Sequence, residues 1–569
     1  MSTTVRICCV LAALIGVVAS TAAQTATAEQ TAFITSPTAM DPSLFAYSVA
    51  ISGDRMVIGA PFESSDAQGV DGLYNPGGAP NSGAAYVFVR DGETWIQEAY
   101  LKPSNTGVDD LFGDAVDIDG DVIVVGAPEE DGFATGINGN MGDGIGTMES
   151  GAAYIFERID GTWRQVAYVK ASNTDKNDRF GSTVTVSGDT VVVGAPYERS
   201  NATGINGNQA NNSALQSGAA YLYERVDDTW AQRAYIKASN ASSVDLFATS
   251  VNLSGDTLVV GAPLESTGGL RTGAAYVFVH GAGGWFEEAF LKAPMLLEHE
   301  RFGSTAAVGD DTLVVSASGT DSAYVFERTG GSWSSGTSLN ALVTAPAELA
   351  PVGLATSGDR IAVAGSVDAS VGPGTSSAGV FVFSRTVDGW AQELIVEPEV
   401  TEPGDMFGFA LGLSGETLLA SAHGQMGNSS DSGAFFGAAY SFEIEPGPWS
   451  VVGSALAGVA GKPSLLGEGT LAASSANAVA LADAAPSAPS GVFLSLASTP
   501  APFKGGTLSA FPFTLLRFVT TNGAGGFTLP FAMPPGVPST TQLWVQVAIQ
   551  DTAAVSGVAL SNALRGTTP

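Results

Sequence analysis

Short apolar stretches alternate with Gly-rich turns through most of the chain, and the same order of stretches returns many times. A clear copy runs through residues 180–198, where FGSTVTV, SGDT and VVVGAPYE follow one another. Alternating apolar positions with β-branched residues predict strands, and the turn at Gly188-Asp189 predicts a hairpin. Stretches such as QEAYLK (97–102) and SGAAYLYERV (217–226) complete each copy. We therefore expect four short strands per repeat.

Tryptophan marks the copies, because each one carries a Trp after a Tyr-x-Phe-like stretch, at spacings of 48 to 68 residues. The marker residues are Trp95, Trp163, Trp230, Trp285, Trp333, Trp390 and Trp449. Seven four-stranded units of this length are what a seven-bladed β-propeller requires. A solenoid is the alternative, and it would need polar caps at both ends. Pairs such as Tyr86/Phe88 and Tyr154/Phe156 share one strand face, so we expect them to pack between blades.

Both ends of the repeat region offer a strand that could close a ring. Residues 29–42 (EQTAFITSPTAMDP) align with residues 97–110 (QEAYLKPSNTGVDD) but lack the Trp. Residues 449–456 (WSVVGSAL) are a weaker copy of the same stretch. One interpretation is that the N-terminal strand completes the last blade and locks the ring. The sequence leaves open which terminal copy does so.

Composition changes near residue 453, since 53 of the 56 acidic residues lie before it. The remainder reads as strands separated by Pro and Gly, for example GVFLSLAS (491–498) and QLWVQVAIQD (542–551). We expect an all-β protein: a seven-bladed β-propeller over residues 24–452 and a small C-terminal β-sandwich over residues 453–569.

Residues 1–23 have the pattern of a secretory signal peptide. Arg6 precedes an apolar run from Ile7 to Val18, and small residues follow at Thr21-Ala22-Ala23. The run is short for a membrane-spanning helix, although a lone N-terminal anchor is the alternative. Both cysteines, Cys8 and Cys9, lie in this leader, so we expect no disulfide, zinc thiolate or cysteine nucleophile in the mature chain. The expected location is secreted or cell-surface, with no transmembrane segment after signal removal.

The charge balance narrows the class of partner. The chain has 23 Lys and Arg against 56 Asp and Glu, a formal net charge of −33. Such a polyanion repels nucleic-acid phosphates and acidic membranes, so we expect no nucleic-acid partner. It favours divalent cations or basic partners instead. We expect a monomer.

The Phe-Gly segments, with Gly-Ala-Pro at 59–61, 126–128, 194–196 and 261–263, resemble the FG-GAP repeats of the integrin α-chain propeller and its bacterial relatives. The resemblance covers about residues 30–450. It implies a rigid extracellular disc for adhesion to protein or polysaccharide, with calcium in some blades. In the family the calcium loop lies between the Phe-Gly and Gly-Ala-Pro strands, and here that segment is shortened to Ser-Gly-Asp or Asp-Gly-Asp. The tail, with PFKGGTL (502–508) and LSNAL (560–564), resembles a C-terminal module of secreted proteins of some bacteria.

Two sets of oxygen ligands are candidates for calcium, the one cofactor that we consider. Calcium takes six to eight oxygens from a loop that wraps around it. The hairpin candidates are Asp117, Asp119 and Asp121. The candidates in the long loop of unit two are Glu129, Glu130, Asp131, Asn138, Asn140 and Asp143. A solvated turn is the alternative for the hairpin, and turns that brace the loop are the alternative for the second set.

Catalytic patterns are weak. His280, His299 and His423 do not form a His-Glu-x-x-His motif or partner a Gly-x-Ser-x-Gly elbow, and His299 is expected on a solvated loop. The many acids recur at turn positions, which favours solvation over catalysis. Tyr74 and Tyr197, on loops, are candidates for a carbohydrate platform.

We therefore expect a secreted, non-catalytic binding or adhesion protein that recognises an extracellular protein or polysaccharide through its propeller loops. One alternative is a secreted hydrolase, for which two carboxylates would converge in a pocket about 5–10 Å apart. Another is a structural envelope component. Asn201-Ala202-Thr203 and Asn240-Ala241-Ser242 are glycosylation acceptors in a host that modifies them, making the protein a glycoprotein there.

Overall fold

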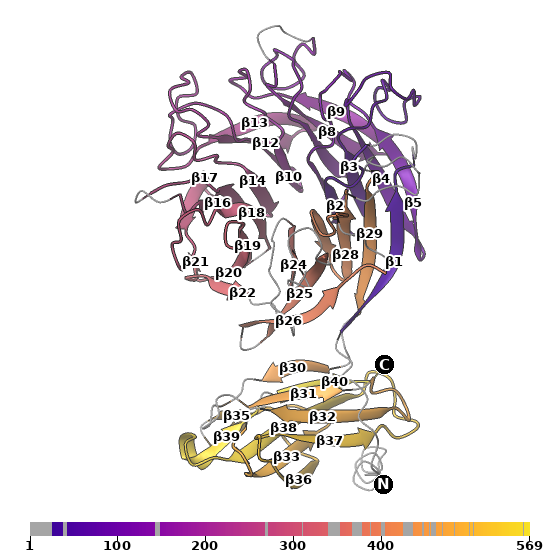
Figure 1. Ribbon diagram of the computed structural model, residues 1–569, viewed down its shortest axis with the longest axis vertical. Helices are drawn as coiled ribbons and strands as arrows, with labels where there is room; N and C mark the ends of the chain where they lie inside the picture. Colours follow the sequence, from indigo (N-terminus) through magenta and orange to yellow (C-terminus); the bar gives the residue numbers. More distant parts are fainter. Residues whose placement is uncertain are drawn as a thin grey trace. The chain divides into compact units, whose positions relative to one another are not determined.

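The computed structural model describes most of the chain, and Figure 1 shows its course. The described residues are 26–37, 43–142, 148–267, 271–309, 311–339, 353–366, 378–386, 389–399, 404–424, 436–445, 449–453, 456, 463–468, 470–482, 484–499, 501–504, 506–561 and 563–568. The expected signal peptide lies outside them. None of the described residues forms a helix long and apolar enough to cross a membrane.

The repeat region folds into successive antiparallel sheets, in most of which neighbouring strands follow one another along the chain. The first two sheets are β2 (Val49–Ser52), β3 (Arg55–Ala60), β4 (Ala84–Asp91), β5 (Thr94–Leu101), and β6 (Val116–Asp119), β7 (Val122–Ala127), β8 (Ala152–Ile159), β9 (Thr162–Val169). The next two are β10 (Thr183–Ser187), β11 (Thr190–Ala195), β12 (Ala219–Val226), β13 (Thr229–Ile236), and β14 (Ser250–Ser254), β15 (Thr257–Ala262), β16 (Ala274–Gly281), β17 (Gly284–Leu291).

The later sheets are less regular, as their sequences are. One contains β18 (Phe302–Val308), β19 (Thr312–Ala317), β20 (Ser322–Thr329), β21 (Ser332–Trp333) and β22 (Thr337–Leu339), which also pairs with β20. Another contains β23 (Leu354–Ser357), β24 (Arg360–Ser366), β25 (Ala378–Thr386) and β26 (Gly389–Val396). A further sheet contains β27 (Leu411–Ser414), β28 (Thr417–Ala422), β29 (Ala438–Glu445) and β1 (Thr27–Thr35). The all-β class with repeated four-stranded sheets is confirmed, and seven as the number of blades stays a prediction.

The Ser-Gly-Asp turn recurs because each copy bonds to the next. In the β10–β11 pair Ser187 lies opposite Thr190, which confirms the hairpin at Gly188-Asp189. The backbone N–H of Gly120 donates to Ser52 Oγ of the preceding sheet at 3.1 Å. In the same way the N–H groups of Gly255, Gly415 and Gly53 donate to the hydroxyl oxygens of Ser187, Ser357 and Ser414. The Gly188 N–H donates to a carboxylate oxygen of Asp119, which occupies the position of the Ser. The first strands of successive sheets are in contact, and β27 contacts β2. The repeats thus satisfy one another's exposed turn donors.

The N-terminal strand completes the sheet of β27 to β29. Strand β1 pairs with β29, where the Thr31 hydroxyl donates to the Ser441 carbonyl at 3.2 Å and the Phe33 and Tyr440 rings lie 5.1 Å apart. The rival copy, β30 (Trp449–Gly453), instead pairs with the C-terminal strand β40 (Ala563–Thr567). Of the two candidate strands, the N-terminal one therefore occupies this position.

The Phe-Gly and Ser-Gly motifs meet between neighbouring sheets. Gly83 forms a backbone bridge with Phe112 of the next sheet, and a Cβ at Gly83 would overlap the Phe112 carbonyl oxygen. Phe112 in turn packs edge-on against Tyr154, at 5.4 Å between ring centroids. Tyr86 and Tyr154 are 1% and 0% exposed, so the Tyr-x-Phe aromatics are core residues as predicted. Trp163 Nε1 donates to Glu98 of the preceding sheet at 2.9 Å, which gives the repeated Trp its role.

The C-terminal module has two larger sheets. One orders β30, β40, β38 (Gln542–Gln550), β33 (Pro489–Ser495) and β36 (Leu515–Thr520), and β39 (Val558–Leu560) pairs with β38. The other orders β31 (Ser464–Glu468), β32 (Ala476–Ala482) and β37 (Phe527–Ala532), and β34 (Ala501–Phe503) pairs with β35 (Gly506–Leu508). A single 3-10 turn, Val555–Gly557, is the helical element of the described residues. The two larger sheets share an apolar core, the layout that a sandwich requires.

The chain divides into two compact units, which broadly separate the repeats from the C-terminal module. One comprises residues 29–383 and 395–443, and the other comprises residues 1–28, 384–394 and 444–569. Because β30 ends at Gly453, the C-terminal sheet begins a few residues before the expected boundary. The sandwich assignment stays a prediction.

Candidate functional site

Unit two departs from the repeat at two positions, and both lie on the loop face, where the connections after β3, β7, β11 and β15 lie. After Gly-Ala-Pro it has Glu129, where the other intact copies have Phe62, Tyr197 and Leu264. Two residues after the Phe of Phe-Gly it has Asp114, where the preceding unit has Tyr47 and units three to five have Ser or Thr. Deviations from a repeated scaffold mark places that the fold itself does not demand.

A single guanidinium holds these acids together. Arg179 precedes the Phe-Gly of the next sheet, and its Nη2 lies 3.1 Å from Glu129 Oε1 and 2.9 Å from Glu149 Oε2. The Arg179 side chain also lies over the Tyr197 ring, 5.5 Å from its centroid. We name Asp114, Glu129, Glu149, Arg179 and Tyr197 the loop-face cluster. All five are partly exposed, so a ligand can reach them.

The cluster carries more negative charge than Arg179 neutralises. Burial, together with the Glu129 charge, raises the pKa of Asp114 to about 7, although Arg179 opposes this shift. Burial also raises the pKa of Glu129. The Arg179 charge lowers it, and the charges of Glu149, Asp109 and Asp131 raise it. Several carboxylates thus repel one another around one cation, an arrangement that an additional cation would stabilise.

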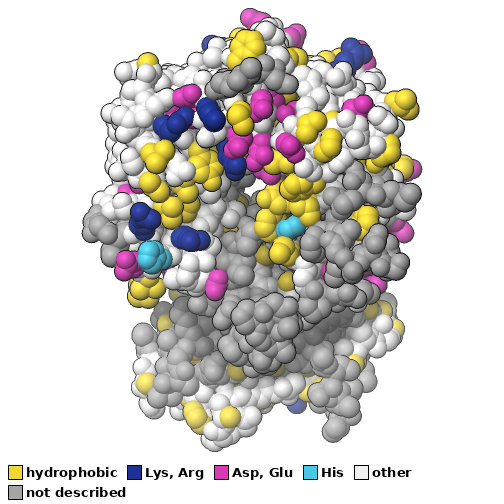
Figure 2. All heavy atoms as spheres, turned by 45° about the horizontal axis from the view of Figure 1, so that its top comes forward, with side chains coloured by type: hydrophobic (Ala, Val, Ile, Leu, Met, Phe, Trp, Pro, Cys, Tyr) yellow, Lys and Arg dark blue, Asp and Glu magenta, His cyan; other side chains and the backbone are white. Residues whose placement is uncertain are grey.

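An aromatic group adjoins the acids. Burial and then the Asp114 charge raise the pKa of Tyr47, which places Tyr47 beside the cluster. The Tyr47 ring lies 5.3 Å from Phe409 and 5.4 Å from His423, and the rings of Phe409 and His423 lie 4.2 Å apart. Figure 2 shows Asp and Glu side chains gathered beside a hollow in the repeat region, with hydrophobic side chains and a His across it. Acids beside aromatic faces suit a cationic ligand group.

The predicted metal ligands of the long loop are engaged by the protein itself. Glu130 pairs with Lys170, and Glu129 with Arg179. Asp131 accepts a hydrogen bond from the Glu149 N–H at 2.8 Å. The amide oxygen of Asn138 accepts from the Tyr168 N–H at 2.9 Å, and that of Asn140 from the Gly142 N–H at 3.1 Å. Asp143 lies outside the described residues.

The hairpin acids are likewise engaged. Asp117 accepts from the Val186 N–H at 2.8 Å, and burial raises its pKa to about 6 against that bond. Asp119 accepts from the Gly188 N–H, and Asp121 lies 4.0 Å from Arg158. Within the part of the chain that the structure describes, no group of three or more His, Cys, Asp or Glu side chains is arranged to hold a metal ion. Calcium stays an untested candidate.

Buried Glu–Lys pairs are a set of polar residues that the sequence interpretation missed. In each pair the Glu is the second residue after the Pro of Gly-Ala-Pro. The Lys is the last residue of the Tyr-x-Lys-like stretch in the same unit. The pairs are Glu63–Lys102 at 2.8 Å, Glu130–Lys170 at 2.7 Å, Glu198–Lys237 at 2.7 Å and Glu265–Lys292. Assigning recurrent acids to solvation was therefore wrong for these Glu residues, which are at most 2% exposed. The signal in the sequence that could have revealed these pairs is that the Glu and the Lys recur together in the same units.

The three histidines and Tyr74, which the sequence also singled out, have different surroundings. The His299 side chain is 72% exposed, as predicted, and His280 lies 3.9 Å from Asp256. His423 is buried, which lowers its pKa. Tyr74 is half-buried and packs against the core of the first unit.

The comparison with protein families agrees with this geometry. Residues 29–88, 95–156, 163–223 and 230–278 each match the FG-GAP repeat. Residues 29–278 therefore contain FG-GAP repeats. The FG-GAP matches include the elements that carry Asp114, Glu129, Glu149 and Tyr197. A comparison with curated proteins found no match.

Solved structures found by structural comparison have little sequence in common with this chain. A candidate 6-phosphogluconolactonase from Bacteroides uniformis is 10% identical, with 65% of this chain and 89% of that chain covered and a TM-score of 0.37. KlAtg21 in complex with the coiled coil of AgAtg16 is 10% identical, covering 66% and 93%, with a TM-score of 0.38. A post-proline cleaving enzyme from Rickettsia typhi is 7% identical, covering 75% and 47%, with a TM-score of 0.32. At these TM-scores none of them bears on the activity of this chain.

Proposed function

We propose that this FG-GAP protein is a secreted or cell-surface, non-catalytic binding protein whose loop-face cluster receives a basic segment of an extracellular protein. The observation that carries the proposal is the shared guanidinium: Arg179 pairs with both Glu129 and Glu149, so one cation faces two carboxylates. A Lys or Arg side chain of a partner would supply the missing cation. Tyr47 and Tyr197 offer aromatic surface beside the acids.

The charge of the whole chain supports the same class of partner. A net charge of −33 attracts basic proteins over several ångströms and repels acidic ones. Such attraction mainly accelerates association, so specificity has to come from a local arrangement of groups. The loop-face cluster provides one, because its acids occur in unit two and not at the matching positions of units one, three and four.

The test measures binding of a Lys- and Arg-rich peptide to the full chain, with a neutral peptide of equal length as reference. We expect the double variant Glu129→Gln/Glu149→Gln to weaken binding at least about tenfold, since close charge pairs dominate such interfaces. The matched control is Asp227→Asn/Asp228→Asn, which removes two exposed charges from the turn between β12 and β13. Equal weakening by both variants would show that binding depends on net charge and not on the loop-face cluster. Binding of a neutral polysaccharide instead, lost in Tyr197→Ala, would reassign the ligand class.

A hydrolase is a second candidate because Asp114 has a pKa of about 7 and interacts electrostatically with a second carboxylate, that of Glu129. A carboxyl group that holds its proton near neutral pH can act as a general acid. This alternative requires turnover of a polysaccharide or ester by the wild-type chain, and loss of that turnover in Asp114→Asn. Wild-type protein without turnover on a broad substrate panel would leave the binding proposal standing.

A further inference from the structure

The C-terminal module contains an apolar cavity between its two larger sheets. The cavity is partly open to solvent, and it lies on the side where β36 and β37 form the edges of their sheets. Val492 and Val545 line it from one sheet, and Leu529 and Phe531 from the other. Mostly apolar walls are typical of small-molecule sites.

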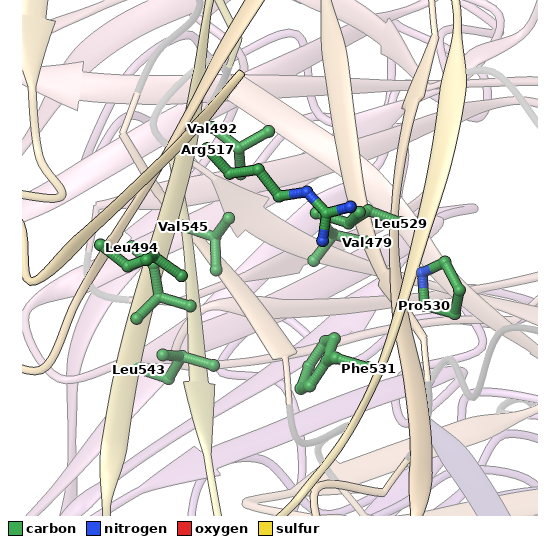
Figure 3. A pocket seen from close by; sticks show the side chains of 10 residues that line it. Val479, Val492, Leu494, Arg517, Leu529, Pro530, Phe531, Leu543 and Val545 are labelled. Atoms are coloured by element: carbon green, nitrogen blue, oxygen red, sulfur yellow. The ribbon is translucent and has the colours of Figure 1, made fainter. Parts of the chain in front are cut away.

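One charged side chain enters this cavity. Arg517 occupies an inward position of β36, between inward Leu515 and Val519, whereas Phe518 points outward and is 78% exposed. Figure 3 shows Arg517 reaching from β36 toward Leu529, while Phe531 and Leu543 lie at the other end of the cavity.

The Arg517 guanidinium makes no hydrogen bond or ion pair with the residues that the structure describes. A guanidinium is always charged at physiological pH, and Arg517 is only partly exposed to solvent, so an anion beside it would stabilise it. The cavity therefore combines an unneutralised cation at one end with an apolar channel behind it. A ligand that matches both features has an anionic head and a hydrocarbon tail.

We propose that this cavity binds a straight-chain fatty carboxylate, with the carboxylate on Arg517 and the tail between the sheets toward Phe531. Arg presents two parallel donors to a carboxylate, which fixes the head group. Burial of each methylene contributes about a fourfold increase in affinity. The site is separate from the loop-face cluster, so neither proposal depends on the other.

The first test titrates the full chain with sodium octanoate, sodium decanoate and decan-1-ol, followed by calorimetry. We expect decanoate to bind about 15-fold more tightly than octanoate because two more methylenes are buried. We expect decanol, which has the same tail and no charge, to bind at least tenfold more weakly than decanoate. Equal binding of decanoate and decanol overturns the proposal.

Variants locate the binding. Arg517→Gln should weaken decanoate at least tenfold and leave decanol unchanged. Leu529→Trp should abolish both by filling the cavity, with its thermal melt confirming a folded module. Phe518→Ser is the matched control, since it lies on the opposite face of the same strand and should change neither. Loss of decanoate binding in Phe518→Ser would assign it to the exposed face and overturn the proposal.

An inward charge on an edge strand also hinders the addition of another strand. If Arg517 serves only to prevent such strand addition, the variant Arg517→Gln should self-associate and should bind decanoate as tightly as the wild type does. That result overturns the proposal. Weakened decanoate binding by a monomeric Arg517→Gln supports it.

Discussion

Lys170 Nζ lies 2.7 Å from Glu130 Oε2, and at most 1% of either side chain is exposed to solvent. The ammonium also donates to Ser150 Oγ at 2.8 Å, and the Tyr168 hydroxyl donates to Glu130 Oε1 at 2.8 Å. Burial lowers the pKa of Lys170, and Glu130 opposes that shift. Since equivalent pairs occur in units one, three and four, these buried charges belong to the scaffold.

Breaking this pair from one side should be costly. We expect Lys170→Met to lower the free energy of unfolding by about 3–5 kcal/mol, because it leaves the Glu130 carboxylate buried without its cation. Urea denaturation of the full chain measures the loss. The double variant Lys170→Met/Glu130→Gln should lose less than the sum of the single variants.

The control for this pair is Arg225→Ala, which breaks two ion pairs that reach solvent, one with Asp189 and one with Glu157. Exposed pairs contribute about 0–1 kcal/mol. A Lys170→Met loss as small as that of Arg225→Ala would contradict a scaffold role for the buried pair.

The contact between Gly218 and Phe247 should tolerate no side chain. Gly218 has φ +81°, and a Cβ there would overlap the backbone carbonyl oxygen of Phe247 in the next sheet. We expect Gly218→Ala to lower the free energy of unfolding by about 3 kcal/mol or more, because two backbones must separate. Gly188→Ala is the control: its φ is +55° and nothing lies within 4 Å, so only the strain of about 1–2 kcal/mol applies. Similar losses in both variants would show that the sheets yield at this contact.

Asp178 should make stability depend on pH. Burial, together with the charges of Glu198 and Asp175, raises its pKa to about 8, although Arg199 opposes this shift. An unfolded Asp has a pKa near 3.9, so between about pH 4 and pH 8 the folded state holds a proton that the unfolded state releases. Stability from this group is present at low pH and falls as the pH rises, by at most about 1.4 kcal/mol per unit.

Asp178→Asn removes that dependence, so its free energy of unfolding should gain on the wild type between pH 4.5 and pH 7.5. Denaturation at three pH values within this window measures the difference. Asp189→Asn, at an exposed turn, serves as control and should show a constant offset. A constant offset for Asp178→Asn as well would mean that its carboxyl group is ionised throughout.

Calcium should leave the melting temperature unchanged. The oxygens of Glu130, Asp131 and Asn138 already accept protein donors, so binding an ion would break those bonds. Thermal melts of the full chain with calcium, with magnesium and with excess chelator measure the effect. A rise that is specific to calcium and reversed by chelator would require an ion on the folded state. Its loss in Glu129→Gln would then place the ion on the long loop.

Much of the fold could be predicted because strand signals are local. Alternation along residues such as 183–187, and the Gly188-Asp189 turn after them, depends on neighbours only a few positions away. Repetition then showed which aromatics form the core, since Tyr86 and Tyr154 occupy the same position of different units. The burial of Glu130 could not be predicted in the same way. A recurrent acid on a loop is expected to be solvated unless the position of its Lys partner in space is known.

The sequence by itself determined the strands, the repeat and the aromatic core, all of which follow from periodic patterns within a unit. Tertiary structure decided which terminal strand pairs with β29, since residues 29–42 and 449–456 carry similar patterns. It also decided which charges meet. Arg179 is separated from Glu129 and Glu149 by tens of residues, and their side chains come together only when neighbouring sheets pack. Electrostatic partners depend on distance in space, which a pattern along the chain does not encode.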